Sequence, residues 1–173
     1  KSTITKNIIN LSTKKKKTNQ DNFIDLFSGA GGFSIGFTKV GFNPLLCVDF
    51  NPNVAATHKE NFSQIPFLEA NLSDKEIQNK IINKYSNKDI GVIVGGPPCQ
   101  GFSMFGKRRF VNTKNYNPAS DKRNDLIFSY INIVSSLQPR WFVMENVPGF
   151  ANLDSGRFLI KVIDCFKKID RKS

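Results

Sequence analysis

Short apolar runs alternate with amphipathic segments along most of this 173-residue chain, and this alternation limits the folds open to it. The runs stand at 23–27, 45–49, 65–69, 90–96 and 141–145, and several are apolar at nearly every position. Continuous apolar character is typical of parallel strands that are buried on both faces of a sheet. The pattern therefore predicts an α/β domain, with an open, doubly wound parallel sheet of about five strands and helices on both faces.

The segments between these runs carry helix signals. Asn51 and Pro52 give an N-cap and a first-turn proline, and Ser73 has a glutamate three positions later, which is the spacing of a capping box. Apolar residues recur at helical spacing over 124–137 and again after position 154. Sheets of this kind bind ligands beyond the carboxyl ends of their strands, so we expect the functional site at that edge.

The net charge of +11 is concentrated in two segments. Residues 1–20 hold six lysines and no acid, and residues 104–123 hold six basic residues against one acid, which together account for the whole excess. A focused positive field suits a polyanion such as nucleic acid. We expect residues 1–22 to be a basic flexible tail and residues 23–173 to belong to one domain.

Other features concern the cellular compartment. No stretch approaches the roughly 20 apolar residues of a membrane-spanning helix, and the lysine-rich start lacks the apolar core of a signal peptide. The three cysteines are odd in number and lack metal-ligand spacing. We therefore expect a reduced, cytoplasmic protein with no membrane partner and no metal site.

The stretch "FIDLFSGAGGFSIGF" (23–37) has the order strand, glycine turn, helix. Gly29, Gly31 and Gly32 allow a sharp turn and close approach of a ligand, and the free amides at a helix start suit an anion. The dinucleotide fingerprint would require a third glycine at position 34, which is Ser34. This argues against an oxidoreductase.

Asp49 ends the second apolar run, 20 residues after Gly29. An acid at this place can bind both ribose hydroxyls of a nucleoside, and Phe50 directly after it could stack on an adenine. The alternative is an aspartate that caps the next helix beside a core phenylalanine. We favour an adenine nucleoside without a pyrophosphate.

Cys99 stands on a stiff corner in "VIVGGPPCQGFS" (92–103). Most cysteines pack in cores as small hydrophobes, but two glycines and two prolines before this one favour an outward side chain. Basic residues follow within ten positions and would favour its thiolate. Cys99 is therefore a candidate nucleophile, with a structural or redox thiol as the alternative.

Three stretches, "DLFSGAGGFSIGF", "GGPPCQGFS" and "FVMENVPGF", resemble the cytosine-5 DNA methyltransferases in this order. The resemblance runs from about Phe23 to Phe150 and implies a Rossmann-like sheet that binds S-adenosylmethionine. It also implies methylation of carbon 5 of a flipped cytosine. Cys99 would add to carbon 6, and Glu145 would meet N3 as the acid.

The resemblance also implies binding residues. Phe27 and Phe50 would flank the adenine, and Asn71 replaces an acid that the family usually has at the end of the third strand. The implied cofactor-binding set is Phe27, Gly29, Ala30, Gly31, Gly32, Asp49, Phe50, Asn71, Leu72, Gly96, Pro98 and Leu126. The implied nucleic-acid contacts are Gln100, Ser103, Lys107, Arg108 and Arg109.

The family's later elements, such as a Gln-x-Arg-x-Arg segment, are not found in this sequence. We therefore expect an incomplete sheet, as the N-terminal catalytic part of a larger enzyme or as a subunit completed by a second polypeptide. The function implied is a DNA (cytosine-5)-methyltransferase of a restriction–modification system, acting on double-stranded DNA and associated with the nucleoid if bacterial. A tRNA cytosine-5 methyltransferase and a non-catalytic binding fragment remain the alternatives.

Overall fold

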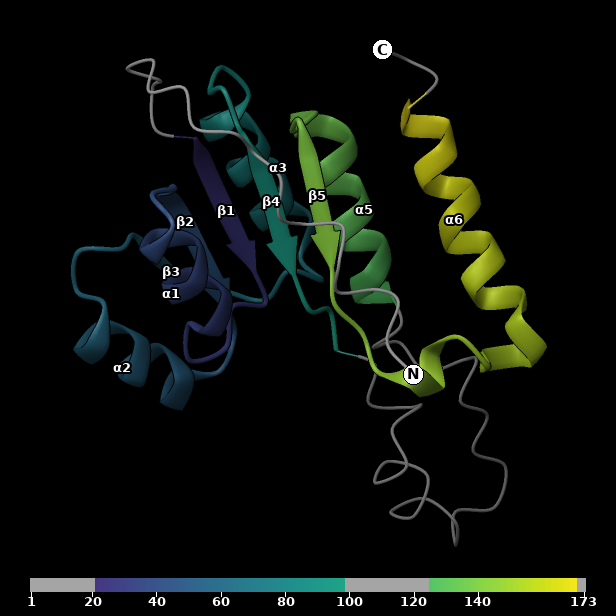
Figure 1. Ribbon diagram of the computed structural model, residues 1–173, viewed down its shortest axis with the longest axis horizontal. Coiled ribbons are helices and arrows are strands. Elements are labelled where there is room, and N and C mark those ends of the chain that lie inside the picture. Colours follow the sequence, from purple (N-terminus) through teal and green to yellow (C-terminus); the bar gives the residue numbers. More distant parts are fainter. Residues whose placement is uncertain (1–20, 99–124, 171–173) are drawn as a thin grey trace, which may run out of the picture.

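The structure is a computed structural model that describes residues 21–98 and 125–170 (Figure 1). Its centre is one sheet of five parallel strands in the order β3-β2-β1-β4-β5. This confirms the α/β prediction and its strand number. The strands are β1 (Asn22–Leu26), β2 (Asn43–Asp49), β3 (Phe67–Glu69), β4 (Val92–Gly95) and β5 (Trp141–Met144).

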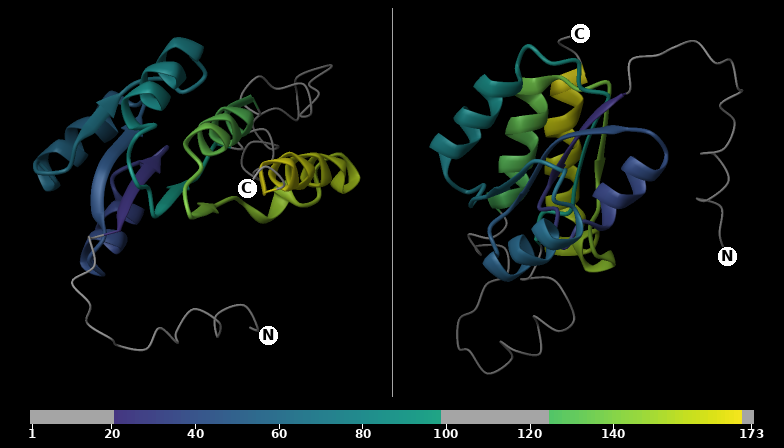
Figure 2. Two further views of the ribbon diagram at one scale, coloured as in Figure 1. Left: turned by 90° about the horizontal axis from the view of Figure 1, so that it is seen from above. Right: turned by 90° about the vertical axis from the view of Figure 1, so that its left-hand side faces the viewer.

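Helices cover both faces of this sheet (Figure 2). One helix, α1, lies on one face, whereas α3, α5 and α6 lie on the other. A further helix, α2, contacts β3. The helices are α1 (Gly32–Lys39), α2 (Pro52–Asn61), α3 (Lys75–Tyr85), α5 (Asp125–Leu137) and α6 (Arg157–Asp170), with short 3₁₀ turns at Pro148–Phe150 and Leu153–Gly156.

Apolar residues of the two central strands make the core on both faces of the sheet. Ile24 and Ile93 pack with Tyr130 of α5, and Phe23 packs on the opposite face against Phe37 of α1. These strands are buried at nearly every position, which is why their sequence runs are continuously apolar. No helix in the described residues is long and apolar enough to cross a membrane.

Of the two predicted helix caps, the structure confirms one and contradicts the other. Asn51 caps α2 as predicted, with its side-chain oxygen accepting from the Asn53 N–H at 3.0 Å. The cap of α3, however, is Asp74, whose carboxylate accepts from the Glu76 N–H at 2.8 Å. The capping box predicted for Ser73 is therefore wrong, because the aspartate that follows it reaches the free amides of the first turn itself.

Gly95 of β4 leaves room for the backbone of β1 and for the ring of Tyr130 on α5. The Tyr130 hydroxyl lies 3.0 Å from each of two carbonyl oxygens, those of Ile93 in β4 and Val143 in β5, and so ties α5 to both strands. A β-carbon added at Gly95 would lie 2.4 Å from the Leu26 carbonyl oxygen and 3.1 Å from the Tyr130 ring. The backbone of β1 cannot move away without breaking the sheet.

Replacing Gly95 with alanine is therefore expected to lower the free energy of unfolding by about 3 kcal/mol, the upper end of the range for overpacked cores. Gly36→Ala on α1 is the matched control, because no atom lies within 4 Å of the added carbon. Alanine is the better helix former, so the control is expected to gain about 0.5–1 kcal/mol. Urea unfolding of both variants measures the difference, and equal stabilities would contradict the packing argument.

Candidate active site

The polar and glycine residues singled out in the sequence gather at the carboxyl edge of the sheet, as expected. The glycine turn follows β1, Asp49 ends β2, Gly96 follows β4 and Glu145 follows β5. Parallel strands end at the same edge, so segments separated by more than 100 residues in sequence meet there (Figure 1).

Asp49 holds the glycine turn in place. Its Oδ2 accepts from the Gly29 N–H at 3.0 Å, and its Oδ1 accepts from the Asn51 N–H at 2.9 Å. Gly29 and Gly31 have φ angles of 55° and 99°, which a residue with a side chain rarely adopts. The carboxylate therefore fixes the turn and bonds the N–H of Asn51. The alternative of Asp49 as the cap of α2 beside a core phenylalanine is wrong, because Asn51 is that cap and Phe50 is exposed.

The glycine turn after β1 packs closely against the C-terminal end of α2. A β-carbon at Gly31 would lie 2.8 Å from the Phe62 ring and 3.3 Å from His58, so only glycine fits there. His58 is fully buried among Phe62 and Phe67, and neither ring nitrogen has a partner in the described residues. Burial lowers the pKa of His58, which favours a neutral ring packed against these two phenylalanines.

A cavity of about 370 Å³ opens at this edge. It joins the turn after β1 to the ends of β4 and β5, and its lining residues are Phe27, Ser28, Gly32, Phe33, Gly96 and Glu145. Four of these were implied by the sequence. Ser28 and Phe33 were missed, although their place inside the glycine stretch was a signal that could have identified them.

Gly96 and Glu145 are in direct contact in this cavity. A β-carbon on Gly96 would lie 2.9 Å from the Glu145 Oε2, so the glycine leaves room for the carboxylate. The Glu145 N–H donates to the Gly95 carbonyl at 2.9 Å, which extends the β4–β5 ladder by one residue and fixes the backbone of the acid. The strand order thus brings a carboxylate next to Gly96, three residues before Cys99 in the sequence.

Several implied cofactor residues lie outside the lining of this cavity. Phe50 follows Asp49 with 60% of its surface exposed, and is therefore free to stack on a flat ligand. The Asn71 side-chain oxygen accepts from the Ser73 N–H at 3.0 Å. The Leu72 side chain is buried in the core, so only its backbone could meet a ligand. Leu126 is half-buried on α5.

The remaining expectations concern residues outside the described part. Pro98 is the last described residue before Cys99, and it is half-buried. Cys99 itself lies outside the described residues. So do all the implied nucleic-acid contacts, which are Gln100, Ser103, Lys107, Arg108 and Arg109, and most of the tail predicted for 1–22.

A buried polar cluster lies beneath the glycine turn. The Ser34 hydroxyl on α1 donates to the Asp25 carboxylate at 2.6 Å, and its oxygen lies 3.1 Å from the Cys47 sulfur. Because the hydroxyl proton is used on Asp25, the oxygen is free to accept from the thiol. Burial raises the pKa of Cys47 to about 12, so this thiol stays protonated at neutral pH. Position 34, where the dinucleotide pattern failed, therefore holds α1 against β1 and β2.

Burial raises the pKa of Asp25 from 3.8 to about 6, against the lowering effect of the Ser34 hydrogen bonds. The folded protein therefore keeps a proton that the unfolded chain releases, and stability falls as the pH rises through about 6. The parent protein is expected to lose about 3 kcal/mol of its free energy of unfolding between pH 4 and pH 8. Asp25→Asn is expected to remove this loss. Urea unfolding at a series of pH values tests this, and parallel curves for the two proteins would contradict it.

Replacing Asp49 with alanine is expected to weaken nucleoside-cofactor binding by about tenfold or more, because two backbone amides lose their acceptor and the turn loses its shape. The matched control is Asp74→Ala, which also removes a carboxylate that accepts from a backbone N–H, but at the start of α3. It should cost about 1 kcal/mol of stability with no loss of binding. Calorimetric titration compares the two, and equal affinities would refute the role of Asp49.

Comparison with known proteins agrees with this geometry. A family model described as C-5 cytosine-specific DNA methylase matches residues 22–170. The chain is 38% identical over 152 residues to the type II methyltransferase M1.HphI of Haemophilus parahaemolyticus, covering 87% of this chain and 38% of that protein. It is also 38% identical over 147 residues to M.XorII of Xanthomonas oryzae pv. oryzae, covering 83% of this chain and 32% of that protein.

A solved structure extends the likeness to three dimensions. It is a protein assigned as a DNA modification methyltransferase encoded within a prophage (E. coli), with a TM-score of 0.67 and 32% identity. The match covers 86% of this chain and 38% of that one. The chain thus spans the N-terminal part, less than half, of these relatives. By its sequence and by the sheet that carries its site, the chain belongs to the C-5 cytosine-specific DNA methylase family.

Proposed function

We propose that this chain forms the cofactor-binding and catalytic part of a DNA (cytosine-5)-methyltransferase in a type II restriction–modification system. One observation carries the proposal: a single cavity is lined by the glycine turn, by Glu145 and by Gly96, which stands three residues before Cys99. The type II methyltransferases that the chain resembles support the substrate class.

The family implies S-adenosylmethionine as the cofactor, and the described residues fit it. No atom lies within 4 Å of the position that a β-carbon would take at Gly29 or Gly32, so the turn has an open face toward a ligand. Phe27 offers an apolar wall in the cavity, and Phe50 is exposed beside Asp49. When bound, the cofactor supplies an electrophilic methyl group at this edge of the sheet.

The chain's own residues would supply the remaining chemistry. Carbon 5 of cytosine is a weak nucleophile until a group adds to carbon 6, and the thiolate of Cys99 forms that carbon–sulfur bond. Electrons then shift toward carbon 5 while Glu145 gives a proton to N3. After carbon 5 has taken the methyl group, water accepts the proton that carbon 5 loses, the carbon–sulfur bond breaks, and N3 returns its proton to Glu145. Cys99 leaves as the thiolate and Glu145 is again a carboxylic acid, so both residues end as they began.

The target cytosine must leave the duplex to reach a site at a strand edge, and extrusion has a free-energy cost that backbone contacts offset. The basic residues Lys107, Arg108 and Arg109 follow Cys99 within ten positions. Gln100 and Ser103 lie between Cys99 and these basic residues. We assign them to the phosphates around the extruded base, where each charge adds affinity that falls as salt rises.

The experiment that tests the proposal uses duplex DNA carrying 5-fluorocytosine, together with S-adenosylmethionine. Fluorine at carbon 5 blocks the final loss of a proton, so the nucleophile stays attached to the base. We expect a denaturation-resistant adduct that mass spectrometry maps to Cys99, formed with the chain alone or after addition of the polypeptide encoded directly downstream. No adduct in either mixture would refute the proposal, and an adduct with RNA alone would replace DNA by RNA as substrate.

A further inference from the structure

A glutamine, Gln78, is fully buried between α3 and α5, two helices that lie on the same face of the sheet (Figure 2). Its side-chain NH₂ group donates to the Leu72 carbonyl at 2.7 Å and to the Ser129 hydroxyl oxygen at 3.1 Å. Its oxygen accepts from the Asn132 amide at 2.8 Å and from the Lys75 ammonium at 3.5 Å. The side chain therefore uses both of its donors and its acceptor, and it joins the segment after β3 to both helices.

The backbone that Gln78 holds belongs to the loop after β3, at the same edge of the sheet as the glycine turn. The loop starts beside Asp49, whose carbonyl accepts from the Ala70 N–H at 2.9 Å. Asn71 and Leu72 follow, and both are in the cofactor-binding set that the sequence implies. Leu72 buries its side chain in the core, whereas Asn71 is exposed, so Asn71 presents the side chain that a ligand would meet.

One peptide unit connects Gln78 to Asn71. The carbonyl that accepts from Gln78 and the N–H of Ser73 belong to the same planar group, the Leu72–Ser73 peptide. That N–H donates to the Asn71 side-chain oxygen at 3.0 Å. The peptide unit is thus held from both sides. Because tilting it would break one bond or the other, and a buried donor without a partner costs free energy, Gln78 restricts the orientation of the Asn71 side chain.

We propose that Gln78 is a positioning residue for the cofactor, and that it acts through the Leu72–Ser73 peptide unit on the side chain of Asn71. Gln78 is fully buried and does not touch the ligand itself. Since the oxygen of Asn71 accepts from Ser73, its NH₂ group is the part that donates to the ligand, and the ring nitrogens of adenine are acceptors of the matching kind. The inference rests on the proposed function, which places S-adenosylmethionine at this edge of the sheet.

Calorimetric titration with S-adenosylmethionine tests the proposal. Gln78→Met keeps the length of the side chain but removes its hydrogen bonds, and it is expected to weaken binding about tenfold. Asn71→Ala is expected to weaken binding by a similar factor. The double variant should lose about the same factor as either single variant, because both changes remove one shared contribution. A glutamine that is merely structural would lower the stability and leave the affinity of the folded protein unchanged.

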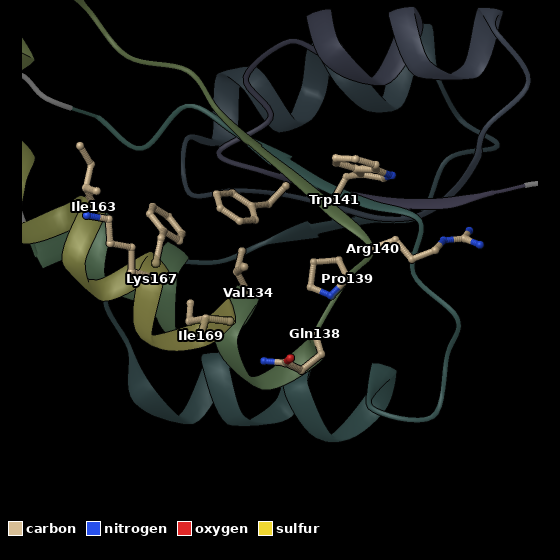
Figure 3. A pocket seen from close by; sticks show the side chains of 10 residues that line it. Val134, Gln138, Pro139, Arg140, Trp141, Ile163, Lys167 and Ile169 are labelled. Carbon is tan, nitrogen blue, oxygen red and sulfur yellow. The ribbon is translucent and has the colours of Figure 1, made fainter. Parts of the chain in front are cut away.

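Gln138→Met is the matched control, because it makes the same exchange at an exposed glutamine directly after α5. The Gln138 side chain donates to the Ser135 carbonyl at 2.6 Å. It lines a groove of about 660 Å³ between β5 and α6 (Figure 3). It stands before β5, and therefore at the opposite edge of the sheet from the loop after β3. Its affinity for the cofactor should equal that of the parent protein.

Gln78→Glu is the second variant, for the case that Gln78→Met does not fold. It keeps the size of the side chain and an oxygen that accepts from Asn132, but an ionised carboxylate has no donor for the Leu72 carbonyl. It is also expected to bind the cofactor about tenfold more weakly than the parent protein. Urea unfolding shows which variants are folded at the temperature of the titration.

Three results would overturn the proposal. The first is an unchanged affinity in the folded Gln78 variants. The second is a double variant in which the two losses multiply, because Gln78 would then act independently of Asn71. The third is an equal loss in Gln138→Met. A parent protein that binds no S-adenosylmethionine would refute the proposed cofactor site and this inference together, whereas a binding parent with equally tight Gln78 variants would refute the inference alone.

Discussion

Cys99→Ser is expected to abolish methyl transfer, with a rate at least about 10⁴-fold below that of the parent protein in whatever assembly is active. An alkoxide forms far less readily than a thiolate at neutral pH, so the serine cannot add to carbon 6. The 5-fluorocytosine adduct should disappear as well. Cofactor affinity should stay unchanged, because the exchange of sulfur for oxygen is small and Cys99 is not in the implied cofactor-binding set.

Cys165→Ser is the matched control, with the same atom exchanged on α6. Its thiol is half-buried among apolar residues and does not line the cavity at the candidate active site. We expect full adduct formation and unchanged turnover. Retained transfer in Cys99→Ser, or equal loss in both variants, would refute covalent catalysis by Cys99.

Glu145→Gln is expected to lower the rate of transfer by about 10² to 10⁴-fold, the usual contribution of a positioned acid. The amide keeps the size of the side chain and its packing against Gly96, but it cannot deliver a proton to N3. Stability and cofactor affinity should change little. Single-turnover kinetics with saturating cofactor and DNA measure the effect on the chemical step alone.

Glu69→Gln provides the comparison, because it makes the same exchange at the end of β3, the strand at the opposite edge of the sheet and outside the cavity. No loss of rate is expected there. If Glu145→Gln also retained its rate, the carboxylate at the end of β5 would be a structural residue, and the proton for N3 would come from elsewhere.

Much of the fold could be predicted from local patterns. β1 and β4 are buried on both faces, so most of their residues are apolar, although β1 also holds Asn22 and the buried Asp25. Asn51–Pro52 marked the start of α2 by local chemistry alone. β3 begins two residues later than expected and α6 three residues later, after a 3₁₀ turn. Such boundaries depend on neighbouring strands and turns more than on the residues themselves.

The site was predictable as a set of positions but not as a set of contacts. Sequence spacing predicted Asp49 as the partner of a nucleoside ribose, but it did not predict the bond to the Gly29 amide, which joins two loops that meet only after folding. The bond to the Asn51 amide is local. The same applies to Ser34. As a failed motif position it carried no further meaning in the sequence, and only the sheet places Asp25 and Cys47 next to it.

The position of Glu145 directly after an edge strand has a dynamic consequence. Backbone bonds at the border of a sheet open more often than those in its middle, because fewer neighbours hold them closed. In the described chain the amides of β5 are therefore expected to exchange their hydrogens faster than those of β1, and the proposed acid shares the motion of its strand. A strand laid along β5 would slow that exchange, and would steady a carboxylate that it never touches.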